Sequence, residues 1–321
     1  MHRPLPDWTS FCTTLPQIEA AAKRIRSLVV ETPTIPFAAL SHEDGCSISL
    51  KCENFQHGFA FKARGACNAV FSLTDEEAAR GVVTHSSGNH AAALARAAKL
   101  RGITAHIVMP ENSARIKLAA VRSLGVEPVM CESTPAAREA MANELMRTTG
   151  ATMIHPFNDA RVIAGQGTVG LEILRQFPDV ETIVVPVGGG GLLAGTLIAV
   201  KSLKPSVRVI AAEPEWANDA FRSLQSGRIE PVLRTDSVAD GLRTPLGSLT
   251  FPIIWQLVDE ILCASEAAIC EAVQRLSTHA RMIAEPSGAV PLAVVQQHCA
   301  RFADQRVVCM VSGGNRDDQA M

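Results

Sequence analysis

The chain has 321 residues, a formal net charge of −2 and a mean hydropathy of +0.15. A mass of 34.2 kDa allows a large buried core and two domains. The nearly balanced charge argues against nucleic acid or an anionic membrane as the main partner. These bounds are typical of a soluble enzyme.

Three features bear on compartment and redox state. The first seven residues lack the apolar core of a signal peptide, so we expect a cytoplasmic protein. The longest uncharged stretch, 182–200, contains a proline and four glycines, which favours strand, loop and helix over a membrane span. The nine cysteines have no paired metal-type spacing, and we expect buried thiols rather than disulfides or ligands.

In chain order, short β-branched runs alternate with helical segments rich in alanine and leucine. The expected strand and helix pairs are 81–84 with 91–100, 105–109 with 113–124, and 182–187 with 192–203. Further strands are expected at 207–212 and 307–311, and an amphipathic helix at 266–278. This alternation predicts an α/β fold with parallel-rich sheets flanked by helices.

Four consecutive glycines lie between the apolar run 182–187 and the helix that follows: Gly188, Gly189, Gly190 and Gly191. Glycine lets the backbone approach an anion closely and adopt positive φ, while N–H groups at a helix start point at the anion. A flexible linker is the alternative, but linkers are polar and rarely separate two apolar segments. The pattern predicts a phosphate-binding loop.

A second glycine pattern, at Gly165, Gly167 and Gly170, satisfies the dinucleotide motif G-x-G-x-x-G. Only 162–164 precede it as a possible strand, and no convincing acidic residue ends a following strand. The context therefore disfavours a nicotinamide site.

Three further motifs carry chemistry. Lys62 lies among apolar and small residues, a setting that desolvates an amine and makes it a better nucleophile, although most lysines are surface charges. The run 85–90 places hydroxyls, an amide and N–H groups at a helix start, as a carboxylate cradle or an ordinary N-cap. Ser312 follows the last strand, at a close-approach turn or a simple strand end.

Together these motifs resemble the pyridoxal-phosphate enzymes of the tryptophan-synthase-β fold type, and within them the threonine/serine dehydratase and serine racemase family. The resemblance runs from about Pro33 to Asp317. The motifs that carry it are Lys51-Cys-Glu-Asn-Phe-Gln56, Phe61-Lys-Ala-Arg-Gly-Ala66, Ser86-Ser-Gly-Asn-His90, His155-Pro156, Gly165-Gln-Gly-Thr168, Gly188 to Gly191, Ala211-Ala-Glu-Pro214, Ala239-Asp-Gly241, Glu285-Pro-Ser-Gly288 and Ser312-Gly-Gly-Asn315.

The resemblance implies a two-domain architecture. Residues 1–72 and 153–321 would form a large cofactor-binding domain, and 73–152 a smaller inserted domain that closes over the substrate. It assigns Gly165–Gly170 a packing and turn role near the cofactor instead of a dinucleotide fingerprint. It also implies a homodimer, although no interface is recognisable in the sequence.

The resemblance also implies individual roles. Lys62 would bind the cofactor covalently and later move the substrate α-proton. The expected cofactor contacts are Phe61, Lys62, Asn89, Gly188, Gly189, Gly190, Gly191, Leu192, Glu285 and Ser312. Asn89 would face the phenolic oxygen and Ser312 the pyridine nitrogen. A hydroxyl cannot protonate the ring as a carboxylate would, so the cofactor would be a restrained electron sink, which suits β-elimination.

The implied reaction is β-elimination, the dehydration and deamination of a β-hydroxy amino acid to a 2-oxo acid or imine plus ammonia. Substrate contacts would come from Ser86, Ser87, Asn89, His90 and His155. The alternative is racemisation of serine or an aspartate-type amino acid, with Lys62 and Ser87 on opposite faces of the α-carbon. A non-catalytic cofactor-binding protein and a β-replacement synthase are disfavoured.

A metal site is implied by Glu213, Asp219 and the carbonyl of Ala217. Oxygen ligands suit Mg²⁺, Mn²⁺ or Ca²⁺. A solvated acidic loop is the alternative interpretation of the same residues.

Departures from the family pattern bear on the substrate. Gly58-Phe-Ala60 replaces a Thr-Gly-Ser pattern, placing an aromatic ring near Lys62, and Ala92 replaces a common glutamine. Arg64 and His155 could shape or charge the pocket, with a structural role as the alternative for Arg64. We expect a bulkier or more acidic substrate than serine or threonine, such as 3-hydroxyaspartate. Because the chain ends soon after Asn315, we expect a catabolic enzyme without a regulatory domain.

Overall fold

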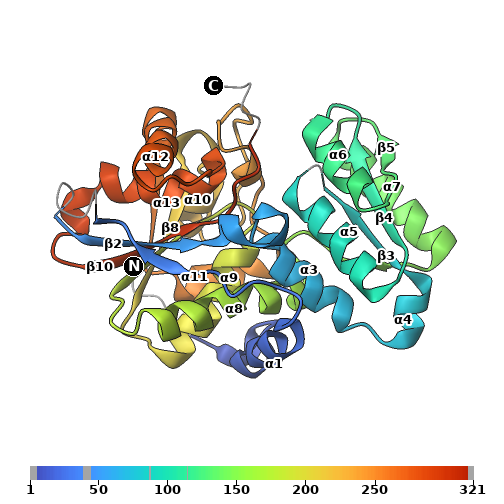
Figure 1. Ribbon diagram of the computed structural model, residues 1–321, viewed down its shortest axis with the longest axis horizontal. Coiled ribbons are helices and arrows are strands. Elements are labelled where there is room, and N and C mark those ends of the chain that lie inside the picture. Colours follow the sequence, from blue (N-terminus) through green and yellow to red (C-terminus); the bar gives the residue numbers. More distant parts are fainter. Residues whose placement is uncertain (1–5, 39–44, 87, 114, 317–321) are drawn as a thin grey trace.

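The computed structural model describes residues 6–38, 45–86, 88–113 and 115–316. Within them, the strands form a six-stranded and a four-stranded sheet, each packed against helices and placed side by side (Figure 1). Apart from one antiparallel pair, β1 with β2, all strand pairs are parallel. The predicted α/β fold with parallel-rich sheets is confirmed.

The six-stranded sheet has the order β1-β2-β10-β7-β8-β9. Its strands are β1 (Thr34–Pro36), β2 (Ser47–Cys52), β10 (Arg306–Val311), β7 (Thr182–Pro186), β8 (Arg208–Pro214) and β9 (Glu260–Ala264). The helices around it are α1 (Leu15–Ile25), α8 (Ala160–Gln176), α9 (Gly191–Leu203), α10 (Asp219–Ser226), α11 (Thr250–Leu257), α12 (Glu266–His279) and α13 (Pro286–Gln297).

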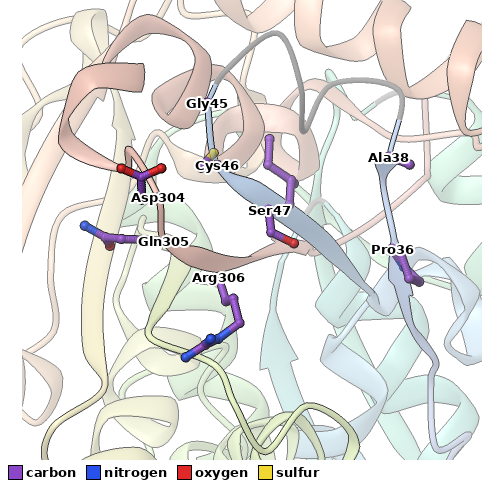
Figure 2. A pocket seen from close by; sticks show the side chains of 9 residues that line it. Pro36, Ala38, Gly45, Cys46, Ser47, Asp304, Gln305 and Arg306 are labelled. Carbon is purple, nitrogen blue, oxygen red and sulfur yellow. The ribbon is translucent and has the colours of Figure 1, made fainter.

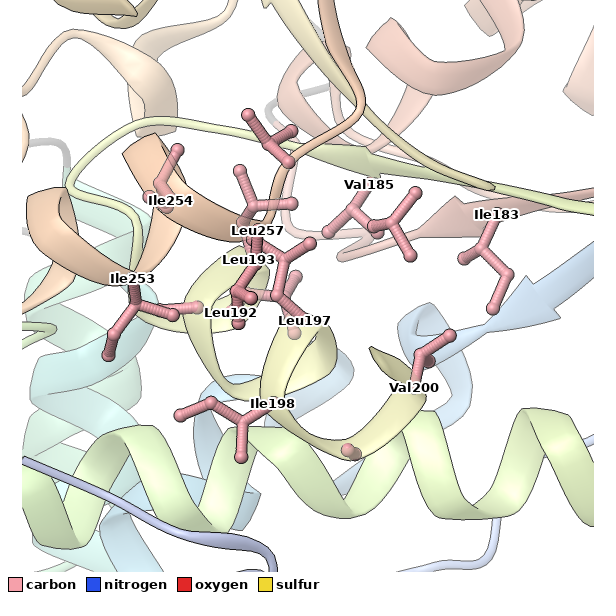
Figure 3. Packing of buried hydrophobic residues seen from close by; sticks show 14 of the residues in the cluster. Ile183, Val185, Leu192, Leu193, Leu197, Ile198, Val200, Ile253, Ile254 and Leu257 are labelled. Atoms are coloured by element: carbon pink, nitrogen blue, oxygen red, sulfur yellow. The ribbon is translucent and has the colours of Figure 1, made fainter. Parts of the chain in front are cut away.

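Helices cover both faces of this sheet. Successive side chains of β7 point to opposite faces, so they belong to different apolar clusters. Ile183 and Val185 pack with α9 and α11, in a cluster that includes Leu193 and Leu197 (Figure 3). Val184 belongs to a second cluster, which α12 and α13 cover. The helices therefore sandwich the sheet and leave its strand ends to form a site.

The four-stranded sheet has the order β5-β4-β3-β6. Its strands are β5 (Val129–Cys131), β4 (Ala105–Pro110), β3 (Val82–His85) and β6 (Thr152–Met153). The helices on this side are α3 (Lys62–Phe71), α4 (Asp75–Arg80), α5 (Asn89–Arg101), α6 (Arg115–Ser123) and α7 (Pro135–Thr149). One face packs on α3 and α5, and the other, through Val83 and Val108, on the Ala142 side of α7.

Each strand and helix expected from the sequence is present, with ends shifted by a few residues. The exception is 162–164, weighed as a possible strand, which lies inside the seventeen-residue helix α8. The Asp159 side chain accepts hydrogen bonds from the N–H groups of Arg161 and Val162 and so caps this helix. No helix in the described ranges is long and apolar enough to cross a bilayer.

The glycines of α8 make close contacts with two neighbouring helices. A Cβ on Gly165 would lie 2.6 Å from the Arg64 carbonyl oxygen on α3, and one on Gly167 would lie 2.8 Å from the Gly195 carbonyl oxygen on α9. The expected packing role is therefore confirmed, but the segment is helical and makes no turn. Main-chain contacts with α8 thus hold the start of α3 and the start of α9 in fixed positions.

The cysteines differ in part from expectation. All nine lie in the described residues and none forms a disulfide, and Cys46, Cys52, Cys67, Cys131 and Cys309 are buried as expected. Cys270 and Cys299 are exposed, and Cys12 and Cys263 are partly buried.

Candidate active site

A cavity of about 600 Å³ lies between the two sheets. Its walls come from residues that follow β3, β6, β7 and β10, and from the first turns of α6 and α7. In α/β proteins, ligands bind beyond the carboxyl ends of parallel strands. Most of the residues that line this cavity lie at such strand ends.

A second hollow, of about 580 Å³, lies at the opposite end of β10 (Figure 2). Two of its polar side chains are bonded away from it. Arg306 donates to the Asp179 carbonyl at 2.6 Å, and Gln305 accepts from the Thr182 hydroxyl at 2.7 Å. This hollow is also remote from the glycine run and Lys62, which line the cavity between the sheets.

Lys62 is the first residue of α3 and lines the cavity between the sheets. Its Nζ donates to the carbonyl oxygen of Pro156 at 2.9 Å and lies 5.0 Å from the centre of the Phe61 ring. Burial lowers the pKa of the amine to about 8, and the nearby Glu285 carboxylate opposes that shift. An amine with this pKa is partly unprotonated near neutral pH, and it can therefore attack a carbonyl group.

The glycine run lines the cavity where β7 gives way to α9. Gly190 has a φ of 86°, in the left-handed region, and caps α9 without a side-chain hydrogen bond. A Cβ on Gly189 would overlap the Phe157 ring, and one on Gly191 would lie 3.1 Å from the main chain of Phe157. Glycine therefore lets Phe157 pack against this loop, and the free N–H groups of the helix start suit a phosphate group. Leu192 follows in the first turn and also lines the cavity.

Asn89 is oriented by two hydrogen bonds. Its Nδ2 donates to Oε1 of Glu285 at 2.8 Å, and its Oδ1 accepts from Nδ2 of Asn315 at 3.0 Å. Burial, with a contribution from Asp240, raises the pKa of Glu285 to about 8. Ser312 is buried at the cavity wall, and its carbonyl oxygen accepts from the Phe61 N–H at 3.1 Å.

The start of α5 faces the same cavity. Its N-cap is Gly88, with no side-chain capping bond, so an ordinary serine or asparagine cap is not what this turn contains. The Ser86 hydroxyl accepts from the Gly88 N–H at 3.3 Å. Nε2 of His90 lies 3.2 Å from the Ile154 carbonyl oxygen, and burial and Lys62 hold the pKa of the ring well below its usual value. Ser87 lies outside the described residues.

His155 enters the cavity just after β6. Its ring lies edge-on to two other rings, with centroids 5.5 Å from His85 and 4.6 Å from Phe157. Burial, the His85 ring and the Lys62 charge lower the pKa of His155 to about 4. The ring is therefore uncharged near neutral pH, so His155 shapes the pocket but does not charge it.

Two cationic side chains that line the cavity, Lys117 and Arg138, were not predicted from the sequence. Lys117 on α6 donates to Oδ2 of Asp240 at 2.5 Å and so joins the two sides of the cavity. Arg138 on α7 has no carboxylate partner among the described residues, and its charge contributes to the lowered pKa of His85. The one sequence signal available was their position in first turns that follow parallel strands.

Arg64 does not line the cavity. Its guanidinium is fully buried and pairs with Glu53 at 2.7 Å and with Glu172 at 2.6 Å. Lys51 joins the same network through Glu172 at 2.7 Å. The structural alternative for Arg64 is therefore correct, and its pocket role is not.

Two other proposed pocket changes are also corrected. Phe59 is 63 % exposed, because Gly58 and Phe59 both have positive φ, 68° and 55°, and the ring does not line the cavity. Ala92 packs against the apolar cluster beside α5 and is likewise absent from the cavity wall.

Glu213 lies at the carboxyl end of β8, and Ala217 and Asp219 follow it in the next turn and at the start of α10. Both carboxylate oxygens of Asp219 are buried and accept no hydrogen bond of standard geometry from the described residues, although the N–H groups of Asp219 itself and of Leu246 lie near enough to favour its charged form. Glu213 accepts from the N–H groups of Ala220 and Phe221. Burial raises the pKa of Asp219 to about 7, and burial and the Asp219 charge raise that of Glu213 well above its usual value. Buried carboxylate oxygens without such a hydrogen bond fit a hard cation. No described group of three His, Cys, Asp or Glu side chains is placed to hold a metal, so other ligands would be main-chain oxygen and water.

The fold and the cavity define an enzyme that holds a phosphate-bearing carbonyl cofactor between a reactive lysine and a glycine loop. The chain belongs to the pyridoxal-phosphate dependent enzyme family, whose pattern matches residues 25–313. The expected family and cofactor are thereby confirmed.

Individual relatives are similar over nearly the whole chain. Serine racemase of Arabidopsis thaliana is 45 % identical over 305 residues, which cover 94 % of this chain and 92 % of the relative. Beta-hydroxyaspartate dehydratase of Paracoccus denitrificans (strain Pd 1222) is 44 % identical over 307 residues, covering 96 % and 98 %. The solved structure of maize serine racemase superposes with a TM-score of 0.94 at 41 % identity, covering 96 % and 95 %.

Proposed function

We propose that this enzyme catalyses β-elimination of a β-hydroxy amino acid to an imine, which water hydrolyses to a 2-oxo acid and ammonia. The observation that carries the proposal is Lys62, a desolvated amine with a pKa of about 8 between the glycine loop and the start of α5. A relative 44 % identical to this chain is named a beta-hydroxyaspartate dehydratase.

Different residues of this chain would hold the cofactor and move the proton. When bound, pyridoxal phosphate supplies an electron sink for the charge left on the α-carbon after deprotonation. Gly188, Gly189, Gly190, Gly191 and Leu192 would hold its phosphate, with Phe61, Asn89, Glu285 and Ser312 around its ring. Lys62 Nζ would attach the cofactor and move the α-proton, which its pKa near 8 allows near neutral pH.

The substrate α-carboxylate would bind at the start of α5. The main-chain N–H groups of Asn89 and His90 in the first turn have no intrahelical partner, and the helix dipole favours an anion there. The hydroxyl groups of Ser86 and Ser87 would complete this cradle. We further propose that residues 73–152 close as one domain over the substrate and exclude water.

An acidic β-substituent is the substrate class that the cavity favours. Arg138 faces the cavity without a carboxylate partner in the described chain, and a guanidinium binds a carboxylate through two parallel hydrogen bonds. We therefore propose a 3-hydroxyaspartate isomer as the preferred substrate, ahead of serine and threonine.

The first experiment is a substrate panel. The holoenzyme is assayed for ammonia and 2-oxo acid with L- and D-serine, threonine and the 3-hydroxyaspartate isomers. Arg138→Met should lower kcat/KM for 3-hydroxyaspartate by roughly 100-fold and for serine by much less. Arg147→Met, on the exposed side of the same helix, is the matched control and should change neither. Equal losses on both substrates would exclude the carboxylate role of Arg138.

Racemisation is the second candidate, because a relative 45 % identical to this chain is named a serine racemase. Lys62 and Ser87 would then act on opposite faces of the α-carbon. Incubation in heavy water distinguishes the two reactions. Inversion with deuterium at the α-carbon and no ammonia would assign the enzyme as a racemase, and stoichiometric ammonia would assign it as a lyase.

We propose that Glu213, the Ala217 carbonyl and Asp219 hold a structural Mg²⁺, Mn²⁺ or Ca²⁺ ion. The buried oxygens of Asp219, which accept no hydrogen bond of standard geometry from the described residues, support this site. Chelation should lower both Tm and activity, and added Mg²⁺ should restore both, because an ion that binds only the folded state stabilises it. A Tm that does not respond to chelator or to Mg²⁺ would exclude the site.

We also propose a homodimer. Phe55, Phe59 and Ile283 are exposed apolar side chains on connected segments, since Asn54 donates to the Ile283 carbonyl and Gly314 to the Phe59 carbonyl. Such a patch is typical of an interface. Light scattering should give twice the chain mass for the wild type and a lower mass for Phe59→Asp.

A further inference from the structure

His155 has one ring nitrogen that the protein uses and one that it leaves free. Nδ1 accepts from the N–H of Asn158 at 3.0 Å and lies 3.3 Å from the N–H of Phe157. Because both partners are donors, Nδ1 must be the unprotonated nitrogen, and the ring proton must be on Nε2. Nε2 has no partner in the described part of the chain, and the residue lines the cavity.

The surroundings keep the ring in one orientation. His85 and Phe157 contact it edge-on from two sides, with interplanar angles of 87° and 90°. Phe157 in turn occupies the space above Gly189, where a Cβ would overlap its ring. The donor on Nε2 is therefore positioned by the same segment that packs against the glycine loop.

The same surroundings keep the ring uncharged. Besides burial, His85 and Lys62 disfavour a second proton, and only Asp159 opposes them. An uncharged imidazole N–H is too weak an acid to deliver a proton to a leaving group, but it binds a neutral oxygen well. A carboxylate would instead call for a cation such as Arg138.

The location of His155 relative to Lys62 identifies the substrate atom. Lys62 Nζ is bonded to the carbonyl of Pro156, the next residue, so His155 lies beside the group that would deprotonate the α-carbon. The α-carboxylate is assigned to the start of α5, which leaves the oxygen on the adjacent β-carbon for His155.

We propose that Nε2–H of His155 is a fixed, uncharged hydrogen-bond donor to the oxygen on the β-carbon of the substrate. This inference rests on the proposed β-elimination. It makes His155 a specificity-determining residue for β-oxygen substrates, and the leaving oxygen must receive its proton from another group.

The test compares two substrates that differ at this atom. Serine carries a β-oxygen, whereas 3-chloroalanine carries chlorine and can still undergo elimination. In His155→Asn, the amide oxygen can replace Nδ1 as acceptor for the 157–158 main chain, but no donor reaches as far as Nε2. The ratio of kcat/KM for serine to that for 3-chloroalanine should fall by roughly 10- to 100-fold. His155→Gln, whose amide N–H can reach the Nε2 position, should recover part of that ratio.

A second measurement does not depend on turnover. In ¹⁵N-histidine-labelled holoenzyme, the signals that disappear in His155→Gln identify the ring by NMR. They should show an unprotonated Nδ1 and a protonated Nε2, without titration between about pH 6 and 9. A proton on Nδ1, or a charged ring at pH 7, would overturn the inference.

The outcomes separate this inference from the proposed function. Wild-type turnover of both substrates with an unchanged ratio in His155→Asn would overturn the role of His155 and leave β-elimination standing. Turnover of neither substrate by the wild type would overturn both.

Discussion

Lys51 and Lys62 are both withdrawn from water, but the protein treats their charges differently. The Nζ of Lys51 donates three hydrogen bonds, to Glu172 at 2.7 Å, to the Thr32 carbonyl at 2.6 Å and to Gln176 at 3.1 Å. Lys62 has one hydrogen bond, to the carbonyl of Pro156. Two carboxylates oppose the effect of burial on the pKa of Lys51, whereas among the described residues Glu285 alone opposes it for Lys62. Burial alone therefore does not make a lysine reactive. The number of hydrogen-bond and carboxylate partners determines whether the buried amine is held as a cation or is left able to lose its proton.

The largest expected effect comes from removing the less satisfied lysine. Lys62→Ala should lower kcat by at least about 10³-fold and abolish the absorbance of attached cofactor, because no other described lysine lines the cavity near the glycine loop with an unpaired amine. The measurement is an ammonia assay together with a visible spectrum. Lys99→Ala, an exposed change on α5, is the control and should alter neither. Residual turnover above a few per cent would assign the chemistry to another group.

Removing the fully bonded lysine should affect stability instead. Lys51→Met leaves Glu172 with Arg64 alone, and breaking a buried ion pair costs about 3 kcal/mol in the free energy of unfolding. Urea unfolding measures this cost, with Lys23→Met at an exposed position as control. The folded fraction of Lys51→Met should retain kcat within a few-fold. A large loss of kcat with an unchanged free energy of unfolding would show that Lys51 acts in catalysis and not in stability.

The pH dependence of cofactor attachment tests the pKa of Lys62 directly. Only the unprotonated amine attacks an aldehyde, so the attachment rate of the apoenzyme should rise about tenfold per pH unit and level off above pH 8. Stopped-flow absorbance between about pH 6 and 10 measures it, with a free lysine analogue as reference. A rate that continues to rise to pH 10 would mean that Lys62 has an ordinary pKa.

The smallest expected effect concerns Glu285, whose charge opposes the shift at Lys62. Glu285→Gln keeps a side-chain oxygen for the Asn89 amide and removes the charge that Glu285 acquires around its pKa of about 8, the range in which Lys62 also titrates. The midpoint of the attachment profile should therefore move to lower pH. A midpoint that moves upward would show that Glu285 acts on Lys62 in some other way.

The parts of the site that could be predicted from sequence are those with a local signal. The glycine run and the start of α5 each follow a recognisable strand, and parallel strands bring their carboxyl ends together. Lys62 follows no predicted strand, and its signal is the apolar and small residues around it. Arg138 and Lys117 also lie in first turns that follow strands, but a charged residue in a helix is most often solvated, so their position did not single them out. Only the packing of α6 and α7 beside the cavity turns them toward it.

The errors also have local causes. Helix α8 was not predicted because Gly165, Gly167 and Gly170 disfavour a helix in isolation, by up to about 1 kcal/mol each. Close packing on α3 and α9 overrides that preference. An aromatic ring was expected near Lys62 because Phe59 lies in the segment 58–60, which comes just before Phe61 and Lys62 in the sequence. Two consecutive residues with positive φ, Gly58 and Phe59, turn that ring outward instead.

The glycine contacts of α8 have a consequence for how such an enzyme can change in evolution. Gly65, Gly165, Gly167 and Gly195 bring α3, α8 and α9 together through main-chain atoms. These close contacts therefore limit how far the lysine and the phosphate loop can move relative to each other. New substrates must be accommodated on the other walls, at α6, α7 and the segment around Asp240. A family can in this way keep one chemistry while its members diverge in what they act upon.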